Sequence, residues 1–140
     1  MRSKERIKET GEVFTPPELV EEILNELPPE IWTDPAKTFL EPSCGNGNFL
    51  VALKARLLEA GHDELQILER LYGVDIMADN IAETKDRLDP AHKYRDILDK
   101  NIVCADGLRY HYRFDGTPPY DKTDDELYED HFSNMFDIED

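Results

Sequence analysis

Three short apolar segments, each ending at or beside an acidic residue, constrain the fold of this chain more than any other feature. They cover residues 37–41, 71–76 and 101–106, and their acids are Glu41, Asp75 and Asp106. Segments with helical periodicity precede the first and separate the others. This alternation predicts an α/β fold class with a three-stranded parallel sheet core and flanking helices, which is half of a doubly wound fold.

The helical segments have recognisable beginnings and ends. Thr15 is predicted to cap the first helix, with Pro16 in its first turn and Glu18 completing a capping box. The apolar residues that follow share one helical face and are Leu19, Val20, Ile23, Leu24 and Leu27. Further helices are predicted over residues 49–60, 63–70 and 78–88, whereas residues 90–100 are ambiguous.

An aromatic segment follows the third predicted strand. Tyr110, Tyr112 and Phe114 alternate with polar residues, which predicts an extra strand with one aromatic face. The three residues between Asp106 and Tyr110 span at most about 14 Å, too short for the crossover that a parallel strand needs. The segment is therefore predicted to form a hairpin, an antiparallel edge or a swapped strand.

The distribution of charge divides the chain into three parts. The net charge is −16, which argues against a surface that mainly grips phosphate. Residues 115–140 carry ten acids and one base, Lys122. We therefore expect a charged N-terminal segment at residues 1–12, one domain at 13–114 and an acidic tail at 115–140.

Other features of the composition point to an ordinary cytoplasmic protein. No apolar run is long enough to span a membrane. Cys44 and Cys104 lack the spacing of a redox or zinc site, so both are predicted to be reduced, buried thiols. The histidines have no second ligand at metal spacing, and no metal site is expected.

The turn after the first predicted strand has a composition suited to ligand binding. Gly45 and Gly47 allow a ligand to approach the backbone closely, and the helix that follows directs its N-terminal amides toward a negative group. A dinucleotide site would carry a third glycine where this chain has Leu50.

The residues around this turn resemble a known family. Glu-Pro-x-Cys-Gly-x-Gly-x-Phe, at residues 41–49, closely resembles the S-adenosylmethionine-binding motif of the N6-adenine-specific DNA methyltransferases of restriction-modification systems. Residues 11–16, 72–76 and 102–108 resemble three further motifs, in a gamma-like order. The resemblance implies a partial Rossmann-like methyltransferase fold, truncated to the cofactor-binding half.

The resemblance also implies roles for individual residues. Phe14 and Thr15 would contact the methionine moiety, whose ammonium group Glu41 would hold. Asp75 would bind the ribose hydroxyls, Ile76 would pack on the adenine ring, and Asp106 would accept from its amino group. The complete predicted cofactor set is Phe14, Thr15, Glu41, Pro42, Ser43, Cys44, Gly45, Gly47, Asp75, Ile76, Asp106 and Leu108.

The catalytic motif of the family has only an imperfect counterpart. Family members carry Asn, Asp or Ser before Pro-Pro and an aromatic residue, a motif that grips the flipped adenine. Here the matching residues are Thr117, Pro118, Pro119 and Tyr120. Thr117 is a shorter acceptor, so the segment is interpreted either as a base-gripping site or as a proline-rich turn.

These observations leave several functions open. The leading one is an S-adenosylmethionine-binding protein of the adenine-N6 type, incomplete or dependent on a partner for catalysis. The alternative is a catalytically inactive, acidic protein that engages a DNA-modifying or DNA-binding protein, and a small-molecule or protein methyltransferase is a third. Because half a sheet has an open edge at its first strand, a homodimer or a second polypeptide is expected to complete it. Alone, the chain is expected to bind DNA only weakly.

Overall fold

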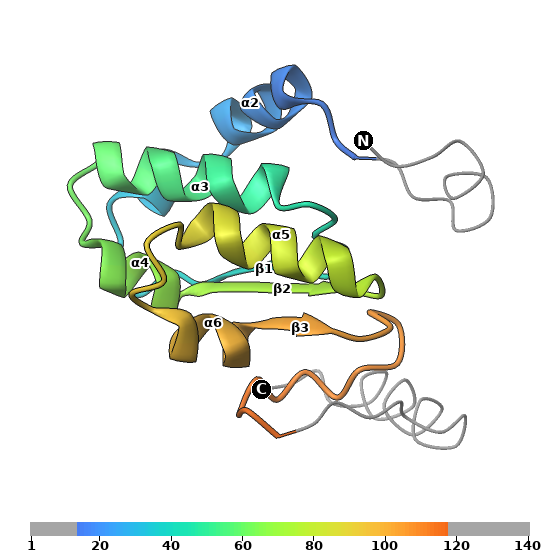
Figure 1. Cartoon of the computed structure of the whole chain (residues 1–140). Coiled ribbons are helices and arrows are strands. Elements are labelled where there is room, and N and C mark those ends of the chain that lie inside the picture. Colours follow the sequence, from blue (N-terminus) through green and yellow to red (C-terminus); the bar gives the residue numbers. More distant parts are fainter. Residues whose placement is uncertain (1–13, 118–140) are drawn as a thin grey trace, which may run out of the picture.

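A parallel three-stranded sheet forms the centre of the protein in the computed structural model, which describes residues 14–117. Its strands are β1 (Phe39–Glu41), β2 (Leu71–Asp75) and β3 (Ile102–Cys104), in the order β1-β2-β3. Phe39 pairs with Leu71, and Asp75 pairs with Cys104. The predicted α/β class with a three-stranded parallel core and flanking helices is confirmed, and it corresponds to a partial Rossmann-like fold (Figure 1).

Helices connect each pair of strands. Between β1 and β2 lie α3 (Asn48–Glu59) and α4 (Glu64–Glu69), and between β2 and β3 lie α5 (Ala78–Leu88) and α6 (Arg95–Asn101). Three of these helices fall where the sequence predicted them, and the ambiguous residues 90–100 contribute α6. α3 and α5 cover one side of the sheet (Figure 1).

The periodicity of α3 explains how it packs. Leu50, Leu53 and Leu57 recur on one face and are fully buried against the sheet. Gly61 ends this helix with a φ of 97°, a left-handed conformation that suits glycine. The predicted glycine at the end of the helix is therefore confirmed.

The first described helix, α2 (Pro17–Glu26), begins one residue later than predicted. Pro16 occupies the N-cap position without any side-chain capping bond, so the capping box predicted for Thr15 and Glu18 does not form. The Thr15 carbonyl instead accepts a hydrogen bond from the Asn48 side chain at 3.0 Å, which holds the preceding segment against the start of α3. A single turn of 3₁₀ helix, Pro29–Trp32, follows α2.

The apolar face of α2 is only partly covered. Val20 and Leu24 are buried against the rest of the domain, whereas Leu19 is 45% exposed and Ile23 38% exposed. The predicted helical face is therefore present, but only one side of it joins the core.

Residues 109–114 do not form the predicted strand or hairpin. Tyr112 and Phe114 have φ values of 56° and 48°, which interrupt the extended backbone that a strand requires. The aromatic rings gather instead against β2: the Phe114 ring centroid lies 4.9 Å from that of Tyr72 and 5.4 Å from that of Tyr110. Packing of aromatic rings on the sheet thus outweighs the two-residue periodicity that suggested a strand.

The edge strands of the described sheet are β1 and β3, so the prediction that the first strand lies at an edge is confirmed. The partner predicted to cover it stays a prediction. Cys104 ends the β3 edge and is exposed, which corrects the prediction of two buried thiols, whereas Cys44 is buried as predicted. Within residues 14–117, no helix combines the length and apolar composition needed to cross a membrane.

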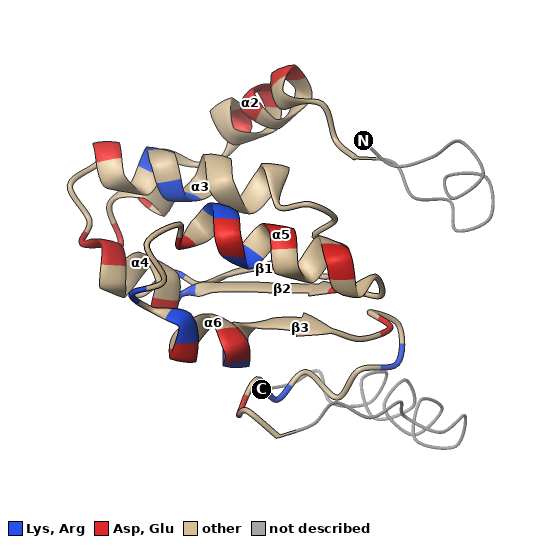
Figure 2. Ribbon diagram, in the orientation of Figure 1, with Lys and Arg blue, Asp and Glu red and all other residues tan. Residues whose placement is uncertain are grey.

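Charged residues lie mainly on the helices (Figure 2). At least one basic side chain of each of α3, α5 and α6 forms an ion pair with an acidic one. Three such ion pairs are Lys54–Glu64, Lys85–Asp99 and Arg95–Asp86, with N–O distances of 2.8, 2.9 and 3.1 Å. Since these three bases are paired with acids, they do not add to an unopposed basic surface.

Candidate cofactor site

The loop at residues 42–47 joins β1 to α3 at the carboxyl end of the sheet, and its glycines adopt left-handed conformations. Gly45 has a φ of 54° and Gly47 a φ of 92°. A Cβ atom added to Gly45 would lie 3.0 Å from the Phe14 ring, and one added to Gly47 would lie 3.0 Å from the Thr84 hydroxyl. Conformation and close packing thus both favour glycine at these positions.

Two side chains from α5 hold this loop in place. The Thr84 hydroxyl donates to the Gly45 carbonyl at 3.0 Å. The Arg87 guanidinium donates to the Asn46 carbonyl at 2.9 Å and to the Asn48 side-chain oxygen at 2.8 Å. The loop is therefore anchored by a helix that lies almost 40 residues further along the chain.

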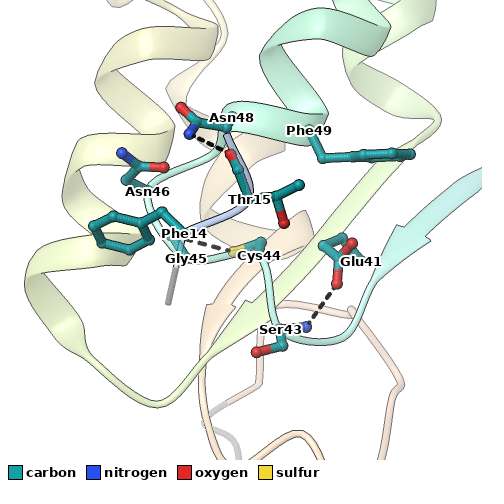
Figure 3. A pocket seen from close by; sticks show the side chains of 9 residues that line it. All are labelled: Phe14, Thr15, Glu41, Ser43, Cys44, Gly45, Asn46, Asn48 and Phe49. Carbon is teal, nitrogen blue, oxygen red and sulfur yellow. Dashed lines mark hydrogen bonds between the residues drawn. The ribbon is translucent and has the colours of Figure 1, made fainter. Parts of the chain in front are cut away.

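A small cavity lies beside this loop, and we call it the loop cavity. It has a volume of about 30 Å³ and is lined by Phe14, Thr15, Glu41, Ser43, Cys44, Gly45, Asn46, Asn48 and Phe49. In Figure 3, the Phe14 side chain lies beside Gly45, and the Glu41 side chain projects from the end of β1. Six of the predicted cofactor residues are thus brought together at this cavity.

Glu41 and Cys44 are the titratable groups of the loop cavity whose ionisation is altered most clearly. Burial raises the pKa of Glu41, and the hydrogen bond from the Ser43 amide at 3.1 Å acts in the opposite direction. Burial, reinforced by the negative charge of Asp75, raises the pKa of Cys44 to about 12. Cys44 is therefore a neutral packing group rather than a nucleophile.

A larger pocket, the strand-end pocket, opens on the other side of Ser43. Its volume is about 440 Å³, and its lining residues are Pro42, Ser43, Asp75, Ile76, Asp106, Gly107 and Leu108. Ser43 lines both cavities, so the two are neighbours. The carboxyl ends of parallel strands are where ligands bind in open α/β sheets, and loops from all three strands meet here.

Two apolar side chains at this pocket are strongly exposed. Ile76 is 62% exposed and Leu108 is 86% exposed, although both are large hydrophobic residues. Both were predicted to bind the cofactor. Exposed apolar groups that line a pocket are suited to binding a flat, weakly polar ring.

The loop after β3 is fitted closely against the loop after β1. A Cβ atom at Gly107 would overlap the Pro42 carbonyl oxygen, so only glycine fits without a backbone shift. One oxygen of Asp106 accepts from the Leu108 amide at 2.9 Å, which fixes the turn that carries Leu108.

A family model described as N-6 DNA Methylase matches residues 1–86, a span that contains β1, the glycine loop, β2 and most of α5. The chain belongs to the N-6 DNA methylase family. No curated protein matches the chain. The protein is thus a DNA N6-methyltransferase-like protein, and membership of this family implies methyl transfer that depends on S-adenosylmethionine.

Sequence reasoning missed several residues of this candidate site. Asn46, Asn48 and Phe49 line the loop cavity, and Thr84 and Arg87 hold the loop. The first three stand within the glycine motif, so their position was a usable signal. Thr84 and Arg87 carry no local signal, because only the packing of α5 brings them to the loop.

Thr117, the one described residue of the predicted catalytic segment, lines neither the loop cavity nor the strand-end pocket. Thr117 lines a separate pocket of about 280 Å³ beside β3, together with Cys104 and Lys100, and this pocket shares no lining residue with the loop cavity or the strand-end pocket. The Thr117 hydroxyl donates to Asp115 at 2.5 Å. Pro118, Pro119 and Tyr120 lie outside the described residues.

Proposed function

We propose that this chain binds S-adenosylmethionine across the loop cavity and the strand-end pocket, as the methyl donor for the N6 amino group of adenine in DNA. The observation that carries the proposal is the strand-end pocket, where the acid that ends β2 and the acid that follows β3 stand beside two exposed apolar side chains. This combination suits adenosine, which has a flat ring and several hydrogen-bond donors.

The residues present fit the adenosine half of the cofactor. Ile76 and Leu108 would pack against the adenine ring. One oxygen of Asp106 is held by the Leu108 amide, and the other would accept from the adenine amino group. Asp75 would accept from the ribose. All four of these residues line the strand-end pocket.

The residues also fit the methionine half. Glu41 is half-buried at the loop cavity and would hold the ammonium group. Neither cavity is lined by a Lys or Arg among the described residues, so no cation opposes the positive sulfonium. A volume of about 30 Å³ holds little more than a water molecule, so Phe14 or Phe49 would have to turn aside when methionine enters.

Titration calorimetry with S-adenosylmethionine tests the proposal. We expect saturable binding, weakened about tenfold by Asp106→Asn because a hydrogen-bond acceptor is replaced. Leu65→Ala is a matched control, since Leu65 is 37% exposed on α4, at the other end of the sheet (Figure 1). Lack of binding at about 1 mM cofactor would contradict the proposal, because it means a binding free energy weaker than about 4 kcal/mol.

A second candidate function is that of a catalytically inactive, acidic binding protein. The observation that favours it is the location of Thr117 in a pocket separate from the cofactor residues. Transfer of a labelled methyl group to duplex DNA, measured for the wild type and for Thr117→Ala, separates the candidates. Transfer that depends on Thr117 supports the methyltransferase. Cofactor binding without any transfer supports the binding protein or an enzyme whose base pocket comes from a partner. A second polypeptide that restores transfer would identify the partner-dependent enzyme.

A further inference from the structure

Asn80 is a buried polar residue that bonds Asp75 of the proposed cofactor site and has no role assigned above. It lies in the first turn of α5 and is 0% exposed. Its side-chain amide donates to one oxygen of Asp75, Oδ2, at 3.0 Å. A fully buried amide is costly unless it is hydrogen-bonded, and the bond to Asp75 offsets part of that cost.

Asp75 connects two loops of the site through its carboxylate. Its Oδ1 accepts from the Gly45 amide at 3.2 Å, and its Oδ2 accepts from the Met77 amide at 3.0 Å in addition to Asn80. The carboxylate is 8% exposed, so these bonds form away from bulk water. Asp75 thereby links the glycine loop to the turn after β2.

We propose that Asn80 is a positioning residue for the cofactor site, which holds the Asp75 carboxylate so that it anchors the glycine loop and presents one oxygen to the ligand. The inference rests on the proposed function, because it assigns the cofactor as the ligand. Asn80 itself does not line the loop cavity or the strand-end pocket.

The number of hydrogen bonds that each Asp75 oxygen already accepts limits how this carboxylate can bind the ribose. A carboxylate oxygen accepts about two hydrogen bonds. Among the described residues, Oδ2 of Asp75 already accepts two hydrogen bonds, from Met77 and Asn80, whereas Oδ1 accepts one, from Gly45. Asp75 therefore offers one acceptor site to a ribose hydroxyl, on the oxygen that also bonds the glycine loop. Binding of the ribose and anchoring of the loop are thus coupled through a single atom.

The test in the free protein is hydrogen exchange of the Gly45 amide, followed by NMR. Asn80→Leu removes the donor with little change in volume, and we expect the protection of Gly45 to fall about tenfold. The Phe39 amide, which bonds the Arg70 carbonyl at 2.9 Å between β1 and β2, reports general loss of stability. Unchanged protection of Gly45 relative to Phe39 would overturn the proposal whether or not the cofactor binds.

A second variant adds a readout that a purely structural role would not produce. Asn80→Asp places another carboxylate against Asp75, and two such groups cannot both ionise without strong repulsion. At low pH the pair shares a proton and the bond is restored, whereas at high pH the two charges repel. We expect Gly45 protection and adenosine affinity to fall about tenfold as the pH rises. A variant that matches the wild type at every pH would contradict the inference.

The probe and the control separate this effect from other titrations. Adenosine lacks the ammonium group assigned to Glu41, so Glu41 does not enter its pH profile. The Cys44 and Cys104 thiols interact electrostatically with Asp75, but their raised pKa values keep them neutral up to mildly alkaline pH. Thr84→Val removes a different bond to the loop and should weaken binding equally at all pH values. Failure of wild-type adenosine binding would count against the proposed function, while the Gly45 protection would still decide the role of Asn80.

Discussion

The two cavities at the carboxyl end of the sheet differ in how their walls are built. The loop cavity is small, and hydrogen bonds from α5 fix the loop that forms it. The strand-end pocket is more than ten times larger, and two exposed apolar side chains stand at it. A fixed polar loop favours recognition by charge, whereas exposed apolar groups favour recognition by burial of a ring. One cofactor would thus be held at its two ends by different forces.

The largest effect is expected where the two loops touch. Gly107→Ala would drive a methyl group into the Pro42 carbonyl, so the loops must separate and the strand-end pocket is distorted. Overpacking of this kind costs about 1–3 kcal/mol, and we expect affinity for S-adenosylmethionine to fall up to about 100-fold in calorimetry. Gly61→Ala, which strains a left-handed residue far from the site, should lower the melting temperature but leave affinity unchanged. Equal loss of affinity in both variants would show that the contact of the loops is unimportant.

The next effect tests recognition by charge. Glu41→Gln removes the carboxylate assigned to the ammonium group, and loss of a charged hydrogen bond should weaken S-adenosylmethionine binding by about 10–100-fold. Wild-type affinity should be full when Glu41 is ionised and should decline as the pH falls through its pKa. Because burial raises that pKa, the decline should begin at a higher pH than for an ordinary glutamate.

The matched measurement for Glu41 uses adenosine. Adenosine lacks the methionine group, so its affinity should be the same for Glu41→Gln and the wild type at every pH. A decrease in adenosine affinity in this variant would mean that Glu41 shapes the whole site rather than one end of it.

A smaller effect tests recognition by burial. Leu108→Ala and Ile76→Ala each remove apolar surface that is largely exposed in the free protein, so stability should change little. Packing on a ring is worth roughly 1–1.5 kcal/mol for a partly buried side chain, and affinity should fall about tenfold. Adenosine and S-adenosylmethionine should lose affinity by the same factor, in contrast to Glu41→Gln. Unequal losses would place the adenine ring elsewhere.

The sequence predicted most of the sheet and one part of the site because both depend on local patterns. The acids after the strands and the glycines of the turn were predicted from their order along the chain, and Ile76 and Leu108 from the family motifs. Thr84, Arg87 and Asn80 were not predicted, since their importance comes from the packing of α5 against a distant loop.

Two errors have a physical explanation in the tertiary structure. Residues 109–114 were predicted as a strand because aromatic and polar residues alternate, but ring packing on Tyr72 and left-handed residues shape the segment instead. Thr15 was predicted to cap α2, but its carbonyl binds Asn48 and the helix begins after Pro16. In both cases a contact distant in sequence overrides a local preference.

The smallest effect on cofactor affinity is expected from modification of the cysteines, which separates the loop cavity from the pocket beside β3. Cys104 is exposed and should be alkylated by iodoacetamide at alkaline pH, whereas Cys44 is buried and its pKa is raised to about 12. Mass spectrometry should locate the label on Cys104 alone. Because Cys104 lines the pocket that contains Thr117 and neither the loop cavity nor the strand-end pocket, affinity for S-adenosylmethionine should stay within about twofold of the unlabelled protein. A label on Cys44 would show that the glycine loop opens far more readily than its hydrogen bonds to Thr84 and Arg87 imply, and a tenfold loss of affinity on labelling Cys104 would show that the two pockets act as one site.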